Sequence, residues 1–152
     1  MSTVKFRNVD ADPSASVITW PTEGVMAALE RGDIDDWSRL AAAVHADPWG
    51  PVARRIESAL EVTRPYGVAP LFDEVIVRAR RAAEQQERLE VARRVAAVLN
   101  ESGLSRADFA EAVGTSTSRL STYLNAKVTP SAALLVRMER VAARHSRAPR
   151  TQ

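Results

Sequence analysis

The stretch LSRADFAEAVGTSTSRLSTYLNAK, residues 104–127, is the part of this chain that decides its fold. It predicts two short helices joined by a tight turn at Gly114, because glycine adopts the positive φ of such a turn at little steric cost. Ser105 is placed to cap the first helix, and Thr115 or Ser116 to cap the second. If two helices are joined by such a tight turn, the spacing of the apolar residues shows whether the helices can pack against each other.

Six residues in this stretch meet the spacing that two steeply crossing helices require. Counting from Arg106, the fourth and eighth positions face inward, the fifth lies where the helices touch, and the ninth makes the turn. The fifteenth and eighteenth positions pack the second helix back onto the first. These packing residues are Phe109, Ala110, Val113, Gly114, Leu120 and Tyr123. The stretch therefore predicts a helix-turn-helix, whose second helix is the element that enters the major groove of DNA.

Residues 91–143 resemble the Xre/Cro-type helix-turn-helix family. The resemblance includes the helix before the motif, the ending NAK at 125–127 and the Pro130-Ser131 pair that opens the next helix. It implies a DNA-binding transcription regulator; many members act as dimers, and some are antitoxins that repress their own operons. Arg106 stands where the family often has Gln, and Ala126 where it often has Gly, so the geometry of the loop after the second helix is open.

The second helix has an apolar and a polar side. At 100° per residue, Ser118 and Thr122 lie opposite Leu120 and Tyr123. The resemblance places the base-facing positions on this polar side, where hydroxyl groups and thymine methyl groups can be contacted. The candidate base-facing residues are Thr117, Ser118, Arg119 and Thr122, and the candidate phosphate contacts are Arg106, Ser121, Asn125 and Lys127. For Arg119 a bidentate contact to guanine and a phosphate contact are both open.

Charge and composition bound the function. The 152 residues carry a net charge of +2, are 45% hydrophobic and 5% aromatic, and include no cysteine. Residues 1–84 hold 10 Lys and Arg against 13 Asp and Glu, whereas residues 85–152 hold 11 against 6. The basic half contains the predicted helix-turn-helix, which suits a polyanionic ligand. Disulfides and thiolate metal sites are excluded, and we expect a cytoplasmic protein without a secretory signal or membrane span.

The segment before residue 70 predicts a small helical domain with its own core. Three short helices begin near Pro21, Asp35 and Pro51, and Gly32 is a candidate left-handed stop for the first. Asp33 or Asp35 is placed to cap the second helix. All three tryptophans of the chain lie in this segment, and we expect them in its core.

The chain as a whole is predicted to be all-α, with four parts. Residues 1–69 form an N-terminal helical domain without an assigned family, in which residues 1–15 are an extended arm or a short hairpin. Residues 70–90 form a helical connector that belongs to one long helix or to two helices with a kink. Residues 91–145 form an Xre/lambda-repressor-like helix-turn-helix domain, whose final helix begins near Pro130 with Thr129 as its cap. Residues 146–152 form a basic tail.

The leading hypothesis is a sequence-specific transcription regulator, a dimeric repressor that binds double-stranded DNA. The alternative is an antitoxin whose residues 1–70 hold a toxin while its C-terminal half represses its own operon. An enzyme in residues 1–70 lacks support, because no nucleophile–base pair, metal-ligand spacing or phosphate-binding loop is present there. We expect no catalytic residues, no metal, no cofactor and no membrane partner.

Overall fold

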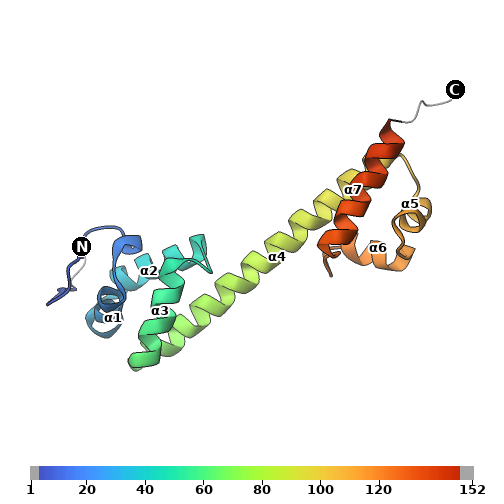
Figure 1. The fold of residues 1–152 in the computed structure, drawn as a ribbon. Coiled ribbons are helices and arrows are strands. Elements are labelled where there is room, and N and C mark those ends of the chain that lie inside the picture. The colour runs from blue at the N-terminus through green and yellow to red at the C-terminus, as the bar shows by residue number, and fades with distance from the viewer. Residues whose placement is uncertain (1–3, 148–152) are drawn as a thin grey trace. The chain divides into compact units, whose positions relative to one another are not determined.

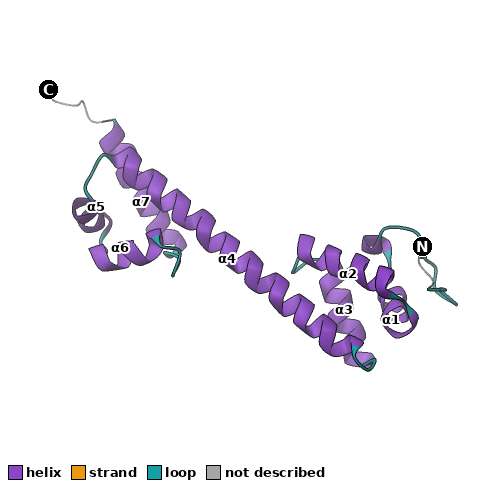
Figure 2. Ribbon diagram, turned by 180° about the vertical axis from the view of Figure 1, so that it is seen from behind, coloured by secondary structure: helices purple, strands orange, loops and turns teal. Residues whose placement is uncertain are grey.

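The chain folds into helices joined by short loops. The computed structural model describes residues 4–147, and Figure 2 shows only helices and loops over this range. The elements are η1 (Val17–Thr19), α1 (Thr22–Arg31), α2 (Ile34–Ala46), α3 (Pro51–Val62), α4 (Val68–Ser102), α5 (Arg106–Val113), α6 (Thr117–Leu124) and α7 (Ala132–Ser146). The all-α prediction is confirmed.

Two compact units make up the chain, and Figure 1 labels their helices. Unit 1 comprises residues 1–83 and unit 2 comprises residues 84–152. Helix α4 contributes residues to both units, and it is one helix from Val68 to Ser102 without a break at its polar middle. Of the two alternatives for the connector, the single long helix is therefore the one observed.

Unit 1 packs α1, α2, α3 and the first turns of α4 around one apolar core. Its largest fully buried side chains include Trp20, Leu29, Leu40, Ile56 and Phe72, which come from five different parts of the segment. Burial of such side chains contributes about 1.5–3 kcal/mol each before the entropy of ordering is counted. Unit 1 thus has its own core.

The start of α2 is held by a reciprocal cap. The Asp33 carboxylate accepts hydrogen bonds from the backbone N–H groups of Asp35 and Asp36, and the Asp36 carboxylate accepts one from the N–H of Asp33. The preceding Gly32 is extended, with φ −76° and ψ 178°, so the prediction of a left-handed stop there was wrong. Glycine is required for space instead, because a Cβ at Gly32 would lie 2.3 Å from the carbonyl oxygen of Ala28.

The N-terminal segment is folded against α2 by one arginine. The Arg39 guanidinium donates hydrogen bonds to the carbonyl oxygens of Pro13 and Ala15, and it stacks 4.9 Å from the ring centroid of Trp20. The indole N–H of Trp20 donates to the carbonyl oxygen of Asp12 at 3.2 Å. These contacts hold residues 12–20 against the unit without any strand pairing.

The tryptophans do not share one environment. Trp20 is fully buried, and Trp37 is half-buried with its indole N–H donating to the carbonyl oxygen of Ala28 at 3.0 Å. Trp49 is 43% exposed in the loop between α2 and α3. The expectation that all three tryptophans lie in the core was therefore wrong for Trp49, since the Asp47–Gly50 turn holds this residue outside the contacts of α2 and α3.

Unit 2 packs α5, α6 and α7 against the last turns of α4. The core includes Val95, Phe109, Leu120, Met138 and Val141, one or two from each helix. Helix α7 begins at Ala132, and the Ser131 hydroxyl caps it by accepting the N–H of Leu134 at 3.1 Å. The prediction of a start near Pro130 with Thr129 as the cap was therefore two residues early, because Ser131 supplies the hydroxyl that satisfies the first turn.

Candidate nucleic-acid interface

The turn between α5 and α6 has the geometry that a helix-turn-helix requires. Gly114 ends α5 in the left-handed conformation, with φ 76° and ψ 36°. The N–H of Thr115 donates to the carbonyl oxygen of Ala110 at 2.9 Å, which closes the last turn of α5. Ser105 caps α5 by accepting the N–H of Asp108, and Ser116 caps α6 by accepting the N–H of Arg119. Both ends of the turn are thus held by short-range hydrogen bonds.

The predicted packing residues meet in one place. Phe109, Ala110, Val113, Leu120 and Tyr123 are all buried in the core of unit 2, and Ala110 is 1% exposed. Because a small side chain stands at Ala110, the helices can approach closely at their crossing. Helix α6 is therefore fixed by its apolar side, which leaves the opposite side to solvent.

The outer side of α6 carries the predicted base-facing residues. Thr117, Ser118 and Arg119 are exposed, whereas Thr122 is half-buried. The hydroxyl of Thr122 donates a hydrogen bond to the carbonyl oxygen of Arg119 at 2.7 Å. The hydroxyls of Thr117 and Ser118 make no hydrogen bond within residues 4–147, so their donors are free for a ligand.

The predicted phosphate contacts gather near the C-terminal end of α6. The Asn125 side-chain amide donates to the hydroxyl of Ser121 at 3.3 Å, and Lys127 is exposed in the loop that follows. Arg106, the first residue of α5, is exposed and lines the same open recess as Leu124. Four polar or cationic groups from α5, α6 and the next loop therefore lie around one end of the second helix.

The loop after α6 contains a backbone conformation that the sequence left open. Ala126 has φ 56°, in the left-handed region that favours glycine. The N–H of Lys127 donates back to the carbonyl oxygen of Thr122 at 3.1 Å, so the loop folds over the last turn of α6. Ala126 is 8% exposed, and the turn is therefore built at the cost of a strained alanine.

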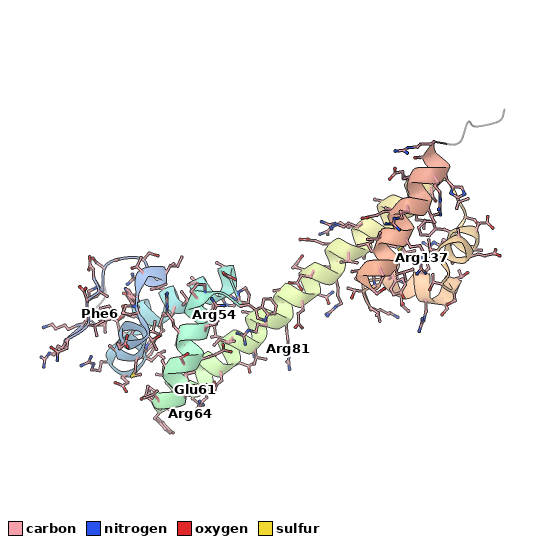
Figure 3. The ribbon with its side chains drawn as sticks, viewed as in Figure 1. Phe6, Arg54, Glu61, Arg64, Arg81 and Arg137 are labelled. Carbon is pink, nitrogen blue, oxygen red and sulfur yellow. The ribbon has the colours of Figure 1, made fainter. Side chains whose placement is uncertain are left out.

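Arg137 is a residue of this site that the sequence analysis missed. It lies on α7 (Figure 3), and its guanidinium Nη1 donates to the carbonyl oxygen of Val113 at 2.9 Å. The same nitrogen lies 3.3 Å from the position that a Cβ on Gly114 would occupy. Arg137 thus braces the turn from α7. No local motif marks this role, since Arg137 shares its helix with Arg140 and Arg144, and only the packing of α7 on α5 selects it.

Two other kinds of feature, a metal-ion site and a membrane-spanning helix, are absent from the described residues. Within residues 4–147, no group of three His, Asp or Glu side chains lies close enough to hold a metal ion. None of the helices described is both long enough and apolar enough to cross a membrane.

Comparison with known protein families gives a match over the same part of the chain. Residues 89–143 match the family model described as Helix-turn-helix. These residues form an Xre-type helix-turn-helix domain. The resemblance predicted for residues 91–143 is confirmed, and the match supports a DNA-binding domain in this part of the chain. Searches of curated proteins and of solved structures gave no match.

Proposed function

We propose that this protein is a sequence-specific transcription repressor that binds its operator as a homodimer. The single observation that carries the proposal is the outer side of α6. This side presents Thr117, Ser118 and Arg119 to solvent, while Leu120 and Tyr123 hold the helix on the core of unit 2. A helix with this division can lie in the major groove without disturbing its own packing.

The proposed contacts are of two kinds, those that read the base sequence and those that position α6 on the DNA backbone. Ser118, Thr122 and Thr117 face the bases, and Arg119 grips a guanine or an adjacent phosphate. Arg106, Ser121, Asn125 and Lys127 contact phosphates, which sets the register of the helix without reading sequence. The link between Asn125 and Ser121 supports this division, because two groups 3.3 Å apart can hold one phosphate together.

A dimer is proposed because one copy of this surface discriminates weakly. Hydroxyl contacts to bases are individually modest, and two half-sites about one helical turn apart multiply their effect. A repressor needs only such occupancy of an operator, without catalysis and without a cofactor. We propose a DNA-binding domain at residues 91–145, a connector at 70–90 and an N-terminal domain at 1–69. We also propose that the protein is cytoplasmic, where its DNA is accessible.

Selection of bound fragments from random double-stranded DNA tests the proposal. The full chain should enrich one motif made of two related half-sites, and sedimentation of the complex should give two chains per DNA. The double variant Ser118→Ala/Thr122→Ala should lose preference for this motif over random DNA by about tenfold, since two modest contacts of about 0.5–1.5 kcal/mol each would be removed.

The matched control removes two hydroxyls from unit 1. Ser38 and Ser58 are both exposed on helices α2 and α3, so Ser38→Ala/Ser58→Ala should bind the motif as the parent does. Enrichment of no motif would contradict sequence-specific binding. An equal loss of affinity for all DNA sequences in the α6 variant would show that Ser118 and Thr122 are not base contacts.

Unit 1 supports a second candidate, an antitoxin that neutralises a toxin through its N-terminal half. The favouring observation is a set of exposed apolar side chains where α3 meets α4: Tyr66 is fully exposed, Val62 is 75% exposed and Leu71 is 46% exposed. Glu61 and Arg64, labelled in Figure 3, lie in the same stretch. Exposed aromatic and apolar groups of this kind are enriched at protein interfaces.

A neighbouring gene separates this candidate from the first. If the candidate is right, an adjacent reading frame encodes a protein that stops growth when expressed alone, and co-expression of this chain restores growth. The variant Val62→Ser/Tyr66→Ser should then lose protection while binding DNA normally. Full protection by that variant would exclude the α3–α4 corner as the toxin contact.

A further inference from the structure

We propose that Thr122 reads a thymine through its Cγ2 methyl group and not through its hydroxyl. The methyl group of thymine would then be the feature recognised at one base pair of each half-site. This inference rests on the proposed function, because it requires α6 to lie in the major groove. It goes further by naming the chemical group that is read and the atom that reads it.

The hydroxyl of Thr122 is already engaged within α6. Its single O–H donor goes to the carbonyl oxygen of Arg119 at 2.7 Å. A hydroxyl has only one proton to donate, so donation to a base would require this bond to break first. The neighbouring Ser118 differs, since its hydroxyl has no partner within residues 4–147 and remains free to donate or accept.

The position of Thr122 is fixed from both sides of the helix. Leu120 and Tyr123 are buried on the opposite side, which turns Thr122 outward. The backbone carbonyl oxygen of Thr122 accepts the N–H of Lys127 at 3.1 Å, so the following loop holds the last turn of α6 in place. The Cβ of threonine carries only Oγ1, Cγ2 and a hydrogen. With its proton donated to the backbone, Oγ1 keeps only acceptor lone pairs and has no donor for the O4 acceptor of thymine, so Cγ2 is the group of Thr122 that can recognise this base.

Thymine is the base that such a methyl group fits. In the major groove the four bases present hydrogen-bond donors and acceptors, and thymine adds the apolar C5 methyl group. Contact between two methyl groups removes apolar surface from water without leaving a polar group unpaired. Ser118 and Thr122, one helical turn apart, would therefore make different kinds of contact. Ser118 would contact a polar base edge, and Thr122 would contact a methyl group.

Replacement of thymine by uracil tests the inference on the full-length protein. Each thymine of the selected operator is replaced in turn by deoxyuridine, which lacks only the C5 methyl group. The parent protein should lose about fourfold in affinity at one thymine of each half-site, as burial of one methyl group would supply. Retained affinity at every uracil would overturn the inference while leaving sequence-specific binding intact. Failure to select any operator would contradict the proposed function itself.

Two variants assign the effect to the correct atom. Thr122→Ser keeps the hydroxyl and removes the methyl group, so it should bind the thymine and uracil operators equally. Thr122→Val keeps a methyl group and removes the hydroxyl, so it should discriminate between them as the parent does. Circular dichroism of each variant checks that the helical fold is retained. Persistent discrimination by Thr122→Ser, or its loss in a folded Thr122→Val, would overturn the assignment.

Discussion

The polar side chains that hold the N-terminal segment of unit 1 and those on the outer side of α6 in unit 2 are used in opposite ways. In unit 1, Arg39 and Trp20 hold the N-terminal segment, and the Arg80 guanidinium makes two hydrogen bonds to the Glu57 carboxylate and one to the carbonyl oxygen of Pro48. In unit 2, the exposed side of α6 carries hydroxyl and guanidinium groups such as Ser118 and Arg119 that face solvent. Polar groups that stabilise a fold are occupied, whereas polar groups that recognise a ligand must be left available.

Charge follows the same division. Acidic residues exceed basic ones in residues 1–84, and the reverse holds in residues 85–152. The ion pair with Glu57 also raises the pKa of Arg80, because the carboxylate favours the protonated guanidinium. The excess of cations in residues 85–152 suits a polyanionic ligand. The comparison predicts that variants of unit 1 change stability, and that variants of unit 2 change DNA binding.

The largest effect is expected from Phe109→Ala. This fully buried side chain lies at the centre of unit 2, and its truncation should lower the free energy of unfolding by about 3–5 kcal/mol and abolish DNA binding. All three tryptophans lie in unit 1, so their fluorescence reports on unit 1 alone, while circular dichroism reports on both units. In urea, the fluorescence midpoint should stay and the dichroism midpoint should fall. Equal shifts of both would show that the units unfold together.

A smaller effect is expected from Arg39→Ala. Its guanidinium holds two carbonyl oxygens and the face of Trp20, so removal should lower the stability of unit 1 by about 1.5–3 kcal/mol. Tryptophan fluorescence in urea measures the change. Arg39→Lys is the control, since it keeps the charge but loses the planar group. Its stability should lie between that of the parent and that of Arg39→Ala. A lower affinity of folded Arg39→Ala for DNA would contradict the prediction that variants of unit 1 change stability alone.

Arg137→Ala should weaken operator binding about fivefold. The charge-assisted bond to the carbonyl oxygen of Val113 braces the turn before α6, and its loss is worth about 1 kcal/mol. Arg140→Ala is the matched control, because Arg140 is exposed on the same helix with the same charge. Fluorescence anisotropy with labelled operator measures both. If the two variants lose affinity equally, Arg137 contributes its charge alone and does not position α6.

The smallest effect is expected from Ala126→Gly. Glycine relieves the left-handed φ of 56°, and unit 2 should gain about 0.5–1 kcal/mol, seen as a rise of a few degrees in its melting temperature. Gly114→Ala is the reverse experiment, because it places a Cβ at φ 76° beside Arg137 and should lower the melting temperature. A lower melting temperature for Ala126→Gly would mean that the methyl group of Ala126 stabilises the loop by more than the strain costs.

Short-range features of the fold were predictable from residues a few positions apart. The caps at Ser105 and Ser116 and the turn at Gly114 depend on bonds within one or two turns of helix. The error at Gly32 has a different origin. The carbonyl oxygen of Ala28 lies where a Cβ would stand, so glycine is needed for space. The close approach of the Ala28 carbonyl oxygen to Gly32 is not marked by any spacing pattern in the sequence.

Long-range features needed the structure. Arg137 is one of several arginines along α7, and only the packing of α7 on α5 brings it to the carbonyl oxygen of Val113. Trp49 looks like a core residue by type, yet its loop leaves it 43% exposed. Side-chain identity does not show which of two chemically similar groups finds a partner.

By itself the sequence predicted an Xre-type helix-turn-helix over residues 91–143, because that motif depends on local turns and on helical spacing. Only the tertiary structure decided which arginine of α7 supports the turn before α6. Arg137 donates to the carbonyl oxygen of Val113, 24 residues earlier in the chain. The physical reason is that a hydrogen bond depends on distance and direction, and for groups far apart in the sequence these exist only once α7 has packed on α5.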